Sequence, residues 1–168
     1  AVHSRACCSA ADIEDARNVC HQLGIPFYVL NFQDEFQQFV VDYFCKEYGS
    51  GRTPNPCLAC NRHLKFDLLL RRALASGVDY LATGHYARID TQNGSVRLLK
   101  AVDPGKDQSY VLYTLGQREL SHLLFPVGGR TKAQIRRLAA ERGLPVADKP
   151  DSQEICFLPE GDYRPFLA

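Results

Sequence analysis

The feature that most constrains this chain is a helical pattern that ends at a glycine and is followed at once by a short apolar run, because the arrangement occurs twice. Apolar residues recur at helical spacing before Gly24 and again before Gly77, where the glycines suit C-terminal caps. The runs that follow, residues 25–32 and 78–83, are typical of buried strands. A repeated order of helix and then strand predicts a parallel sheet.

Four amphipathic helices are predicted from the spacing of apolar residues, over residues 9–23, 33–47, 64–76 and 132–142. Ser9 followed by Asp12 resembles a capping box at the start of the first helix. Gly143 stands where the last helix is expected to end. The helices therefore alternate with the predicted strands along the chain.

The other local signals predict a loop and a hairpin. Two glycines and two prolines interrupt residues 49–56, so this segment is expected to be irregular. Asn93 and Gly94 lie between two strand-like runs, residues 86–90 and 96–100, and predict a tight antiparallel turn. A small hairpin is therefore expected to branch from the main sheet.

Together these elements predict an α/β fold with a doubly wound, mostly parallel sheet and a small β-hairpin insertion. Ligands bind such folds beyond the carboxyl ends of the strands, and Gly84 and His85 directly follow the second predicted strand. A glycine lets a ligand approach the backbone, and a histidine can donate a hydrogen bond or titrate near neutrality. An ordinary loop residue is the alternative for His85.

The composition restricts the class of protein. The 168 residues are 45% hydrophobic, which is enough for one domain with a buried core. No apolar run approaches the roughly 20 residues that cross a bilayer, and no signal peptide is visible, so a cytoplasmic location is expected. Twenty basic and 19 acidic residues give a net charge of +1, which does not support nucleic-acid binding. The chain contains no methionine, and we expect it to be a fragment.

Cys57 and Cys60 form a C-x-x-C pattern directly after the sequence TPNP. Seven cysteines in a chain with long helical patterns and no signal peptide indicate reduced thiols rather than a disulfide scaffold. At a helix start the helix dipole lowers the pKa of a thiol, which favours a nucleophile. Half of a zinc site, a redox pair and inert buried thiols are the alternatives, although neither a second C-x-x-C nor a spaced histidine pair is present.

Two further segments carry polar groups that suit a site. Lys106, Asp107 and Gln108 follow a Pro-Gly turn and place a cation, an anion and an amide together, a set that suits phosphates and base edges. A solvated loop is the alternative for this segment. Cys156 follows the polar sequence DSQEI, and an incidental cysteine in a loop is the alternative there.

Five segments in a fixed order resemble the tRNA-uridine 2-sulfurtransferase family, the tRNA-specific 2-thiouridylases also called MnmA or TrmU. They are TPNPCLACNRHLKF at 53–66, ATGHYAR at 82–88, KDQSYVL at 106–112, FPVG at 125–128 and DSQEICF at 151–157. The resemblance implies a Rossmann-like PP-loop ATP pyrophosphatase domain over residues 1–158 and the start of a central domain over residues 159–168. The family's pyrophosphate loop and C-terminal domains are expected to lie outside this sequence.

The resemblance also implies a reaction and a role for each matching residue. ATP, with Mg²⁺, adenylates the C2 oxygen of the wobble uridine of tRNA, and sulfur from a cysteine persulfide then displaces AMP to give 2-thiouridine. Cys60 matches the nucleophile and Cys156 the cysteine that carries the persulfide, and a disulfide joins the two after transfer. A cysteine desulfurase or a sulfur-relay protein is the implied sulfur donor. The remaining implied contacts are ATP at Gly84, the target base at Asn55, Pro56 and Cys57, and tRNA at His85, Lys106, Asp107 and Gln108.

Two other classes of protein stay open. Cys57, Cys60 and Cys156 together could hold zinc or an iron–sulfur cluster with one open coordination position. A noncatalytic nucleotide-binding relative of the same fold would have no use for the paired cysteines. In the sulfurtransferase interpretation no residue of this chain is a metal ligand, so metal analysis separates it from the first alternative.

Overall fold

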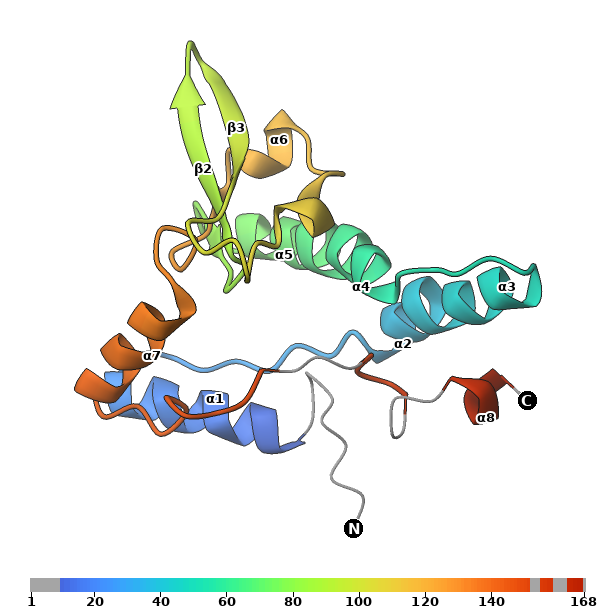
Figure 1. Cartoon of the computed structure of the whole chain (residues 1–168), viewed down its shortest axis with the longest axis horizontal. Coiled ribbons are helices and arrows are strands. Elements are labelled where there is room, and N and C mark those ends of the chain that lie inside the picture. Colours follow the sequence, from blue (N-terminus) through green and yellow to red (C-terminus); the bar gives the residue numbers. More distant parts are fainter. Residues whose placement is uncertain (1–9, 152–154, 159–162, 168) are drawn as a thin grey trace.

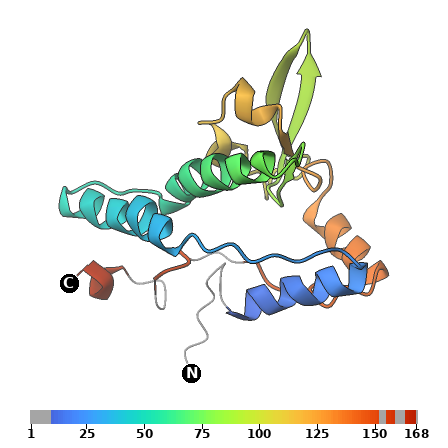
Figure 2. The same cartoon turned by 180° about the vertical axis from the view of Figure 1, so that it is seen from behind.

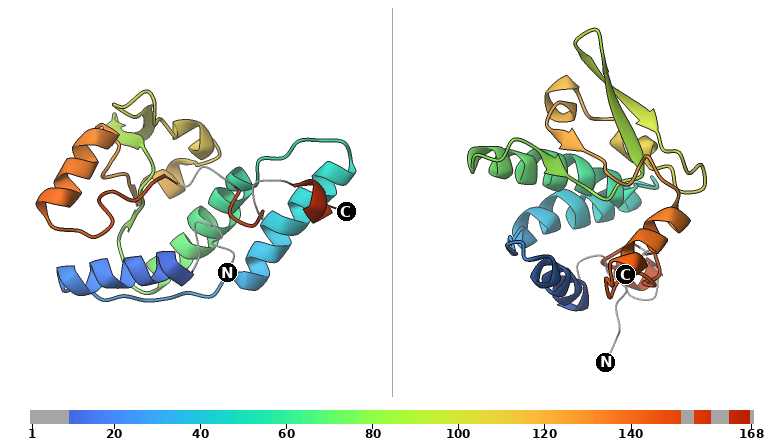
Figure 3. Two further views of the ribbon diagram at one scale, coloured as in Figure 1. Left: turned by 60° about the horizontal axis from the view of Figure 1, so that its bottom comes forward. Right: turned by 90° about the vertical axis from the view of Figure 1, so that its left-hand side faces the viewer.

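The computed structural model describes residues 10–151, 155–158 and 163–167. Its middle consists of two continuous helical runs, which lie side by side in the left panel of Figure 3. A hairpin projects away from these runs in Figures 1 and 2. None of the helices in the described ranges is both long and apolar enough to span a membrane.

The first helical run consists of α2 (Gln33–Phe36), η1 (Gln37–Asp42) and α3 (Tyr43–Gly49), and it confirms the predicted helix. The second consists of α4 (Pro56–Ala59), η2 (Cys60–Leu69) and α5 (Leu70–Ala75). Both η1 and η2 are π-helical, so their backbone hydrogen bonds reach one residue further than in an α-helix. The second run begins at Pro56 rather than at Leu64, because a local cap starts the helix inside the predicted loop.

Helix α1 (Ala10–Leu23) confirms the first predicted helix, and Gly24 follows it with a φ of 67°, the left-handed conformation of a helix end. The predicted cap residue Ser9 lies outside the described residues. Helix α7 (Lys132–Glu141) is also confirmed, and its N-cap residue Thr131 forms a capping box with Gln134. Three further short helical segments are η3 (Ser109–Leu112), α6 (Gln117–Leu120) and α8 (Arg164–Leu167).

The strands form two small sheets. β1 (Leu81–Ala82) and β4 (Leu123–Leu124) are parallel, whereas β2 (Ala87–Gln92) and β3 (Ser95–Lys100) form the antiparallel hairpin. The hairpin turns at Asn93 and Gly94 with φ values of 51° and 76°, as the sequence predicts. The α/β class with a parallel sheet and a hairpin is therefore confirmed, and within the described residues the parallel sheet has two strands.

The prediction of a buried strand over residues 25–32 is wrong for the described chain. The segment is extended but pairs with no described strand, and it runs from α1 to α2 in Figure 1. Tyr28 is 81% exposed and Val29 is 59% exposed. Residues with high β-propensity form a strand only where a neighbouring strand supplies hydrogen bonds and packing. The second predicted strand, residues 78–83, is reduced to Leu81–Ala82 for the same reason.

The main core lies between the second helical run, the base of the hairpin and β4. Phe66 and Leu70 from the helix pack with Ala87, Leu112 and Leu123, and all five are almost completely buried. Burying one leucine or phenylalanine side chain contributes roughly 1.5 to 3 kcal/mol to stability. This core fixes the carboxyl end of β1 and the start of β2, where ligand binding was expected.

A second apolar group joins the end of the chain to the first helical run. Phe157 packs edge-on against Phe44, with ring centroids 5.2 Å apart, and Tyr163 stacks on Tyr48 at 4.7 Å. Phe166 of α8 also contacts Phe157 at 5.4 Å. Described residues on both sides of position 158 therefore belong to one apolar group. The predicted domain boundary at this position stays a prediction.

Candidate functional site

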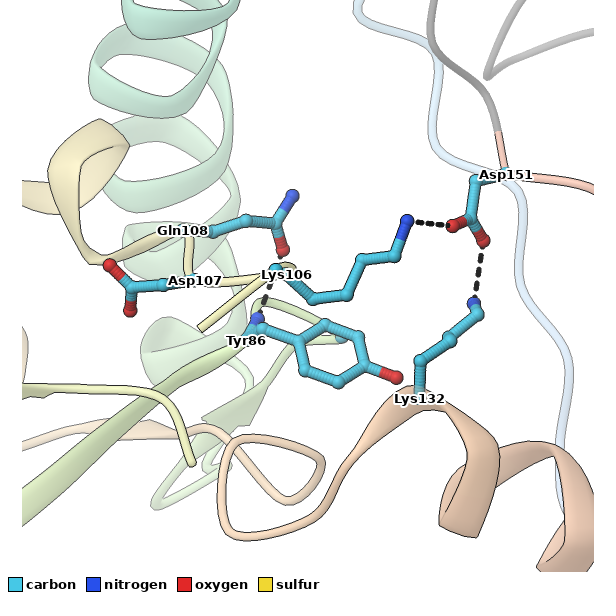
Figure 4. A pocket seen from close by; sticks show the side chains of 8 residues that line it. Tyr86, Lys106, Asp107, Gln108, Lys132 and Asp151 are labelled. Atoms are coloured by element: carbon cyan, nitrogen blue, oxygen red, sulfur yellow. Dashed lines mark hydrogen bonds and ion pairs between the residues drawn. The ribbon is translucent and has the colours of Figure 1, made fainter. Parts of the chain in front are cut away.

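A pocket of about 380 Å³ opens at the carboxyl end of β1. Its lining residues are Gly84, Tyr86, Gly105, Lys106, Asp107, Gln108, Lys132 and Asp151 (Figure 4). The pocket thus joins the predicted ATP contact at Gly84 to three of the predicted tRNA contacts. A Cβ atom at Gly84 would meet nothing within 4 Å, so a ligand can approach the backbone there.

Asp151 bridges two lysines across this pocket (Figure 4). Its two carboxylate oxygens lie 2.8 Å from Nζ of Lys106 and 2.7 Å from Nζ of Lys132. The hydrogen bonds from Lys106 and Lys132 lower the pKa of Asp151 to about 2, and the hydrogen bond to Asp151 raises the pKa of Lys106. Asp151 and Lys106 are therefore charged at neutral pH. Lys132 and Asp151 were not among the predicted site residues.

Asp107 and Gln108 use their side chains to shape the loop. The Asp107 carboxylate accepts hydrogen bonds from the Ala101 amide at 2.7 Å and the Ser109 hydroxyl at 2.8 Å. Burial opposes ionisation of Asp107, but these hydrogen bonds outweigh it and lower its pKa. The Gln108 side chain accepts from the Tyr86 amide at 2.9 Å, while the Gln108 amide donates to the Tyr86 carbonyl at 2.8 Å. These bonds fix the backbone from which Lys106 extends.

The Tyr86 hydroxyl is buried in the pocket wall. Tyr86 is 8% exposed, and its hydroxyl oxygen has no hydrogen-bond partner among the described residues. Burial raises its pKa, and the nearby carboxylates of Asp151 and Asp103 act in the same direction. The hydroxyl therefore carries its proton at neutral pH, and it points toward the Lys132 side chain in Figure 4.

The His85 side chain lies in the core rather than in the pocket. Its ring is 5.6 Å from the Phe66 ring and 6.1 Å from the Phe125 ring, and Nδ1 lies 2.8 Å from the Thr83 hydroxyl. Burial, with a smaller effect from the charge of Lys65, lowers the pKa of His85 to about 4. Of the two general properties of a histidine considered from the sequence, this environment disfavours titration near neutrality, because burial opposes the charged ring. Its predicted contact with tRNA stays a prediction.

We expect the His85 ring to stay neutral until the pH falls to about 4. A histidine in the unfolded chain binds its proton near pH 6.5. Between pH 6.5 and 4 a proton therefore binds this histidine in the unfolded chain but not in the folded one. The free energy of unfolding is thus expected to decrease by up to about 3 kcal/mol as the pH is lowered through this range. An NMR titration of the ring, assigned with His85→Gln, checks this. A midpoint near pH 6.5 would show that the ring is open to solvent and that the description of the core is wrong.

The second helical run carries the C-x-x-C pair on its first turns. The Asn55 side-chain oxygen accepts hydrogen bonds from the amides of Cys57 at 3.0 Å and Leu58 at 3.3 Å, and Pro56 occupies the first helical position. Cys57 is exposed and Cys60 is half-buried. The predicted base contacts at Asn55, Pro56 and Cys57 therefore form one helix start.

The first helical run contacts both of the segments that carry Cys60 and Cys156. On one side, Phe39 of η1 stacks on His63 of η2 at 5.1 Å, one turn after Cys60. On the other side, Phe157 follows the half-buried Cys156 and packs against Phe36 at 5.9 Å. Two segments whose cysteines lie 96 positions apart in the sequence thus both pack against the first helical run. Within the described ranges, no group of three or more His, Cys, Asp or Glu side chains is arranged to hold a metal ion.

Known proteins match this chain over most of its length. A profile of the family described as "tRNA methyl transferase HUP domain" matches residues 1–160. The chain is 58% identical to the tRNA-specific 2-thiouridylase MnmA of Geobacter metallireducens, over 96% of the chain and 44% of that relative. The proteins of the same name from Carboxydothermus hydrogenoformans and Roseiflexus castenholzii are 56% and 55% identical over 96% of the chain, which covers 45% and 48% of them.

The chain therefore spans less than half the length of these curated relatives. The same relatives carry the name that the five sequence segments predicted, and the HUP domain is a Rossmann-like α/β domain, as the helix and strand pattern predicted. The expected resemblance is confirmed, and the chain belongs to the tRNA methyl transferase HUP domain family.

Proposed function

We propose that the protein containing this chain replaces the C2 oxygen of a tRNA wobble uridine with sulfur, in a reaction driven by ATP. The observation that carries the proposal is the Cys57–Cys60 pair at the capped start of the second helical run, with the Cys156 segment packed through Phe157 against the neighbouring first run. The family description names methyl transfer, whereas the names of the relatives and the cysteine pattern favour sulfur transfer. A cytoplasmic location is part of the same proposal.

The first proposed step activates the uridine. Uracil C2 is a poor electrophile because its oxygen is a poor leaving group, and transfer of AMP from ATP to that oxygen, with release of pyrophosphate, makes it a good one. Gly84, with its open backbone at the carboxyl end of β1, is the proposed ATP contact in this chain. Mg²⁺ would neutralise charge on the phosphates and bind mainly through them, so no residue of this chain is assigned to it.

The second proposed step transfers sulfur. The terminal sulfur of a persulfide on Cys156 attacks C2, and AMP leaves with the oxygen. The Cys60 thiolate then attacks Sγ of Cys156, which forms a Cys60–Cys156 disulfide and releases the outer sulfur, with its electron pair, on C2 as 2-thiouridine. A thiol reductant must reopen the disulfide, and a cysteine desulfurase or sulfur-relay protein must reload Cys156.

The start of the second helical run is the proposed site for the target base. The positive end of the helix dipole favours negative charge near Cys57 and Cys60, as thiolate chemistry requires. The base must leave its stack to reach this position, because C2 is inaccessible inside an RNA helix or loop stack. Asn55 and Pro56 fix the backbone here, so the base would meet a rigid surface.

The direct test is a reaction with the full-length protein. Unmodified tRNA transcript, ATP, Mg²⁺ and a sulfur donor are incubated with the protein, and the digested nucleosides are separated by mass spectrometry. We expect 2-thiouridine that depends on ATP and on the protein. A methylated nucleoside in its place would support the chemistry named in the family description and contradict the proposal.

Replacing Lys106 by alanine is expected to weaken tRNA binding while ATP binding changes little. Lys106 extends its ammonium group over the pocket, and a lysine that contacts a phosphate contributes a salt-sensitive, sequence-independent attraction. Filter binding at several salt concentrations should show a salt slope that is smaller by about 0.7 to 0.9. The matched control is Lys46→Ala, at an exposed lysine on α3. An unchanged slope for Lys106→Ala would leave this segment as a solvated loop.

A further inference from the structure

We propose that Lys106, Lys132 and the Tyr86 hydroxyl form a site for a single phosphate group, and that the Asp151 carboxylate occupies this site until a phosphate displaces it. The proposal adds Tyr86, Lys132 and Asp151 to the residues implied by sequence. It rests on the proposed function only for the source of the phosphate, which we take to be the tRNA backbone.

The lysines already hold an anion between them. One carboxylate group lies within 2.8 Å of two ammonium groups that come from the loop after the hairpin and from the first residue of α7. The three side chains are 26% to 37% exposed, so the ions are partly desolvated yet open to an incoming ligand. A phosphate presents the same kind of charged oxygen with more acceptor positions, and can therefore replace the carboxylate.

The position of Lys132 is fixed by its backbone. Its amide donates a hydrogen bond to the Asp103 carboxylate at 2.9 Å, and the other oxygen of Asp103 accepts from the Gly105 amide at 3.0 Å. Asp103 thus ties the start of α7 to the turn that carries Lys106. Because the two lysines are held together before any ligand arrives, little further ordering is needed when a phosphate binds.

The buried Tyr86 hydroxyl is an independent observation that points to an anionic ligand in this pocket. A buried hydroxyl without a hydrogen bond costs roughly 1 to 3 kcal/mol, and this one, which has no partner among the described residues, lies in the pocket wall beside the bridge. It keeps its proton at neutral pH, so it can donate to an anion. A phosphate oxygen between Lys132 and Tyr86 would satisfy it.

Asp151 is the carboxylate in direct contact with both lysines within the described part of the chain. Asp107, although it also lines the pocket, directs its oxygens to the Ala101 amide and the Ser109 hydroxyl. Among the described residues, the site therefore has one internal competitor for a phosphate. Replacing Asp151 by the isosteric asparagine removes the competing charge with little change in shape.

The test uses the full-length protein and two probes, inorganic phosphate in calorimetry and tRNA transcript in filter binding. We expect Asp151→Asn to strengthen phosphate binding several-fold and Lys132→Ala to weaken it about tenfold, as for the loss of one charge-assisted hydrogen bond. Tyr86→Phe should weaken phosphate binding about fivefold and leave the melting temperature unchanged or higher, because it removes an unsatisfied buried group. Lys46→Ala is the control for general charge.

The possible outcomes distinguish a failure of the proposed phosphate site from a failure of the proposed thiolation function. Weaker phosphate binding by Asp151→Asn, or unchanged binding by Tyr86→Phe, would overturn the proposed site. If phosphate binding responds as expected but tRNA binding does not, tRNA is the wrong source, and competition with ATP tests the other source. Thiolation by the wild-type protein is measured in the same preparations, so failure of the proposed function is seen separately.

Discussion

Replacing Cys156 by serine is expected to abolish both the persulfide and thiolation in the full-length protein, whereas Cys60→Ser should keep the persulfide and fail to turn over. Serine is nearly isosteric with cysteine but cannot carry a terminal sulfur, and it cannot attack the inner sulfur of a persulfide as a thiolate does. Persulfide on Cys156 is measured by mass spectrometry of its peptide, and 2-thiouridine is measured in the tRNA. The two variants should thus differ in the first readout and agree in the second.

Cys57→Ser is the matched control for these variants. Cys57 lies on the same helix turn as Cys60 and is exposed, but the proposed reaction gives its thiol no bond to make or break. We therefore expect a milder loss of activity. If Cys57→Ser is as damaging as the other two and also strips a bound metal, the three-cysteine metal site is correct and the assigned roles are wrong.

The second large effect is expected for stability, at Gly128→Ala. A Cβ atom at Gly128 would lie 1.6 Å from the carbonyl oxygen of Ala87 and 2.4 Å from its carbonyl carbon. Ala87 is completely buried in the main core, so the backbone there cannot move without opening the packing. Overpacking by added methylene groups usually costs about 1 to 3 kcal/mol, and we expect at least about 3 kcal/mol because the clash is with backbone.

Gly129→Ala provides a control one residue away. Nothing lies within 4 Å of a Cβ atom at Gly129, and its φ is not in the left-handed range. We expect a change in the free energy of unfolding within about 0.5 kcal/mol, as for an ordinary surface substitution. Urea unfolding of the full-length variants compares the two. Equal stabilities would mean that the hairpin base is not packed against residue 128 as described.

Local signals predicted most of the fold. The turn at Asn93 and Gly94, and the helices that end before Gly24 and Gly143, depend on residues close together in the sequence, and all of them are confirmed. The strand over residues 25–32 failed because a strand needs a neighbour, and no property of the segment itself shows whether one is present. The second helical run begins at Pro56, eight residues before the helix that apolar spacing predicted from residue 64, because its start is set by the Asn55 cap and not by an apolar face.

The site was only partly predictable for a similar reason. Gly84 and Lys106 stand in recognisable segments, and the structure brings them to one pocket. Lys132 carries no local signal, and its role depends on the 2.7 Å contact with a residue 19 positions later, Asp151. Asp151 opens the segment that ends in Cys156 and Phe157, which was the available clue. Burial of His85 likewise depends on which side chains surround it, and a sequence pattern does not show this.

The measurement that most directly tests the proposed division of roles is a single turnover of the full-length protein whose Cys156 has been loaded with sulfur, without added reductant. The protein is digested under non-reducing conditions, and its disulfide-linked peptides are identified and quantified by mass spectrometry. The amount of 2-thiouridine in the tRNA is quantified in parallel. We predict one Cys60–Cys156 disulfide for each 2-thiouridine formed, and neither product without ATP. Thiolated tRNA without that disulfide, or with a disulfide to Cys57 in its place, would contradict the account.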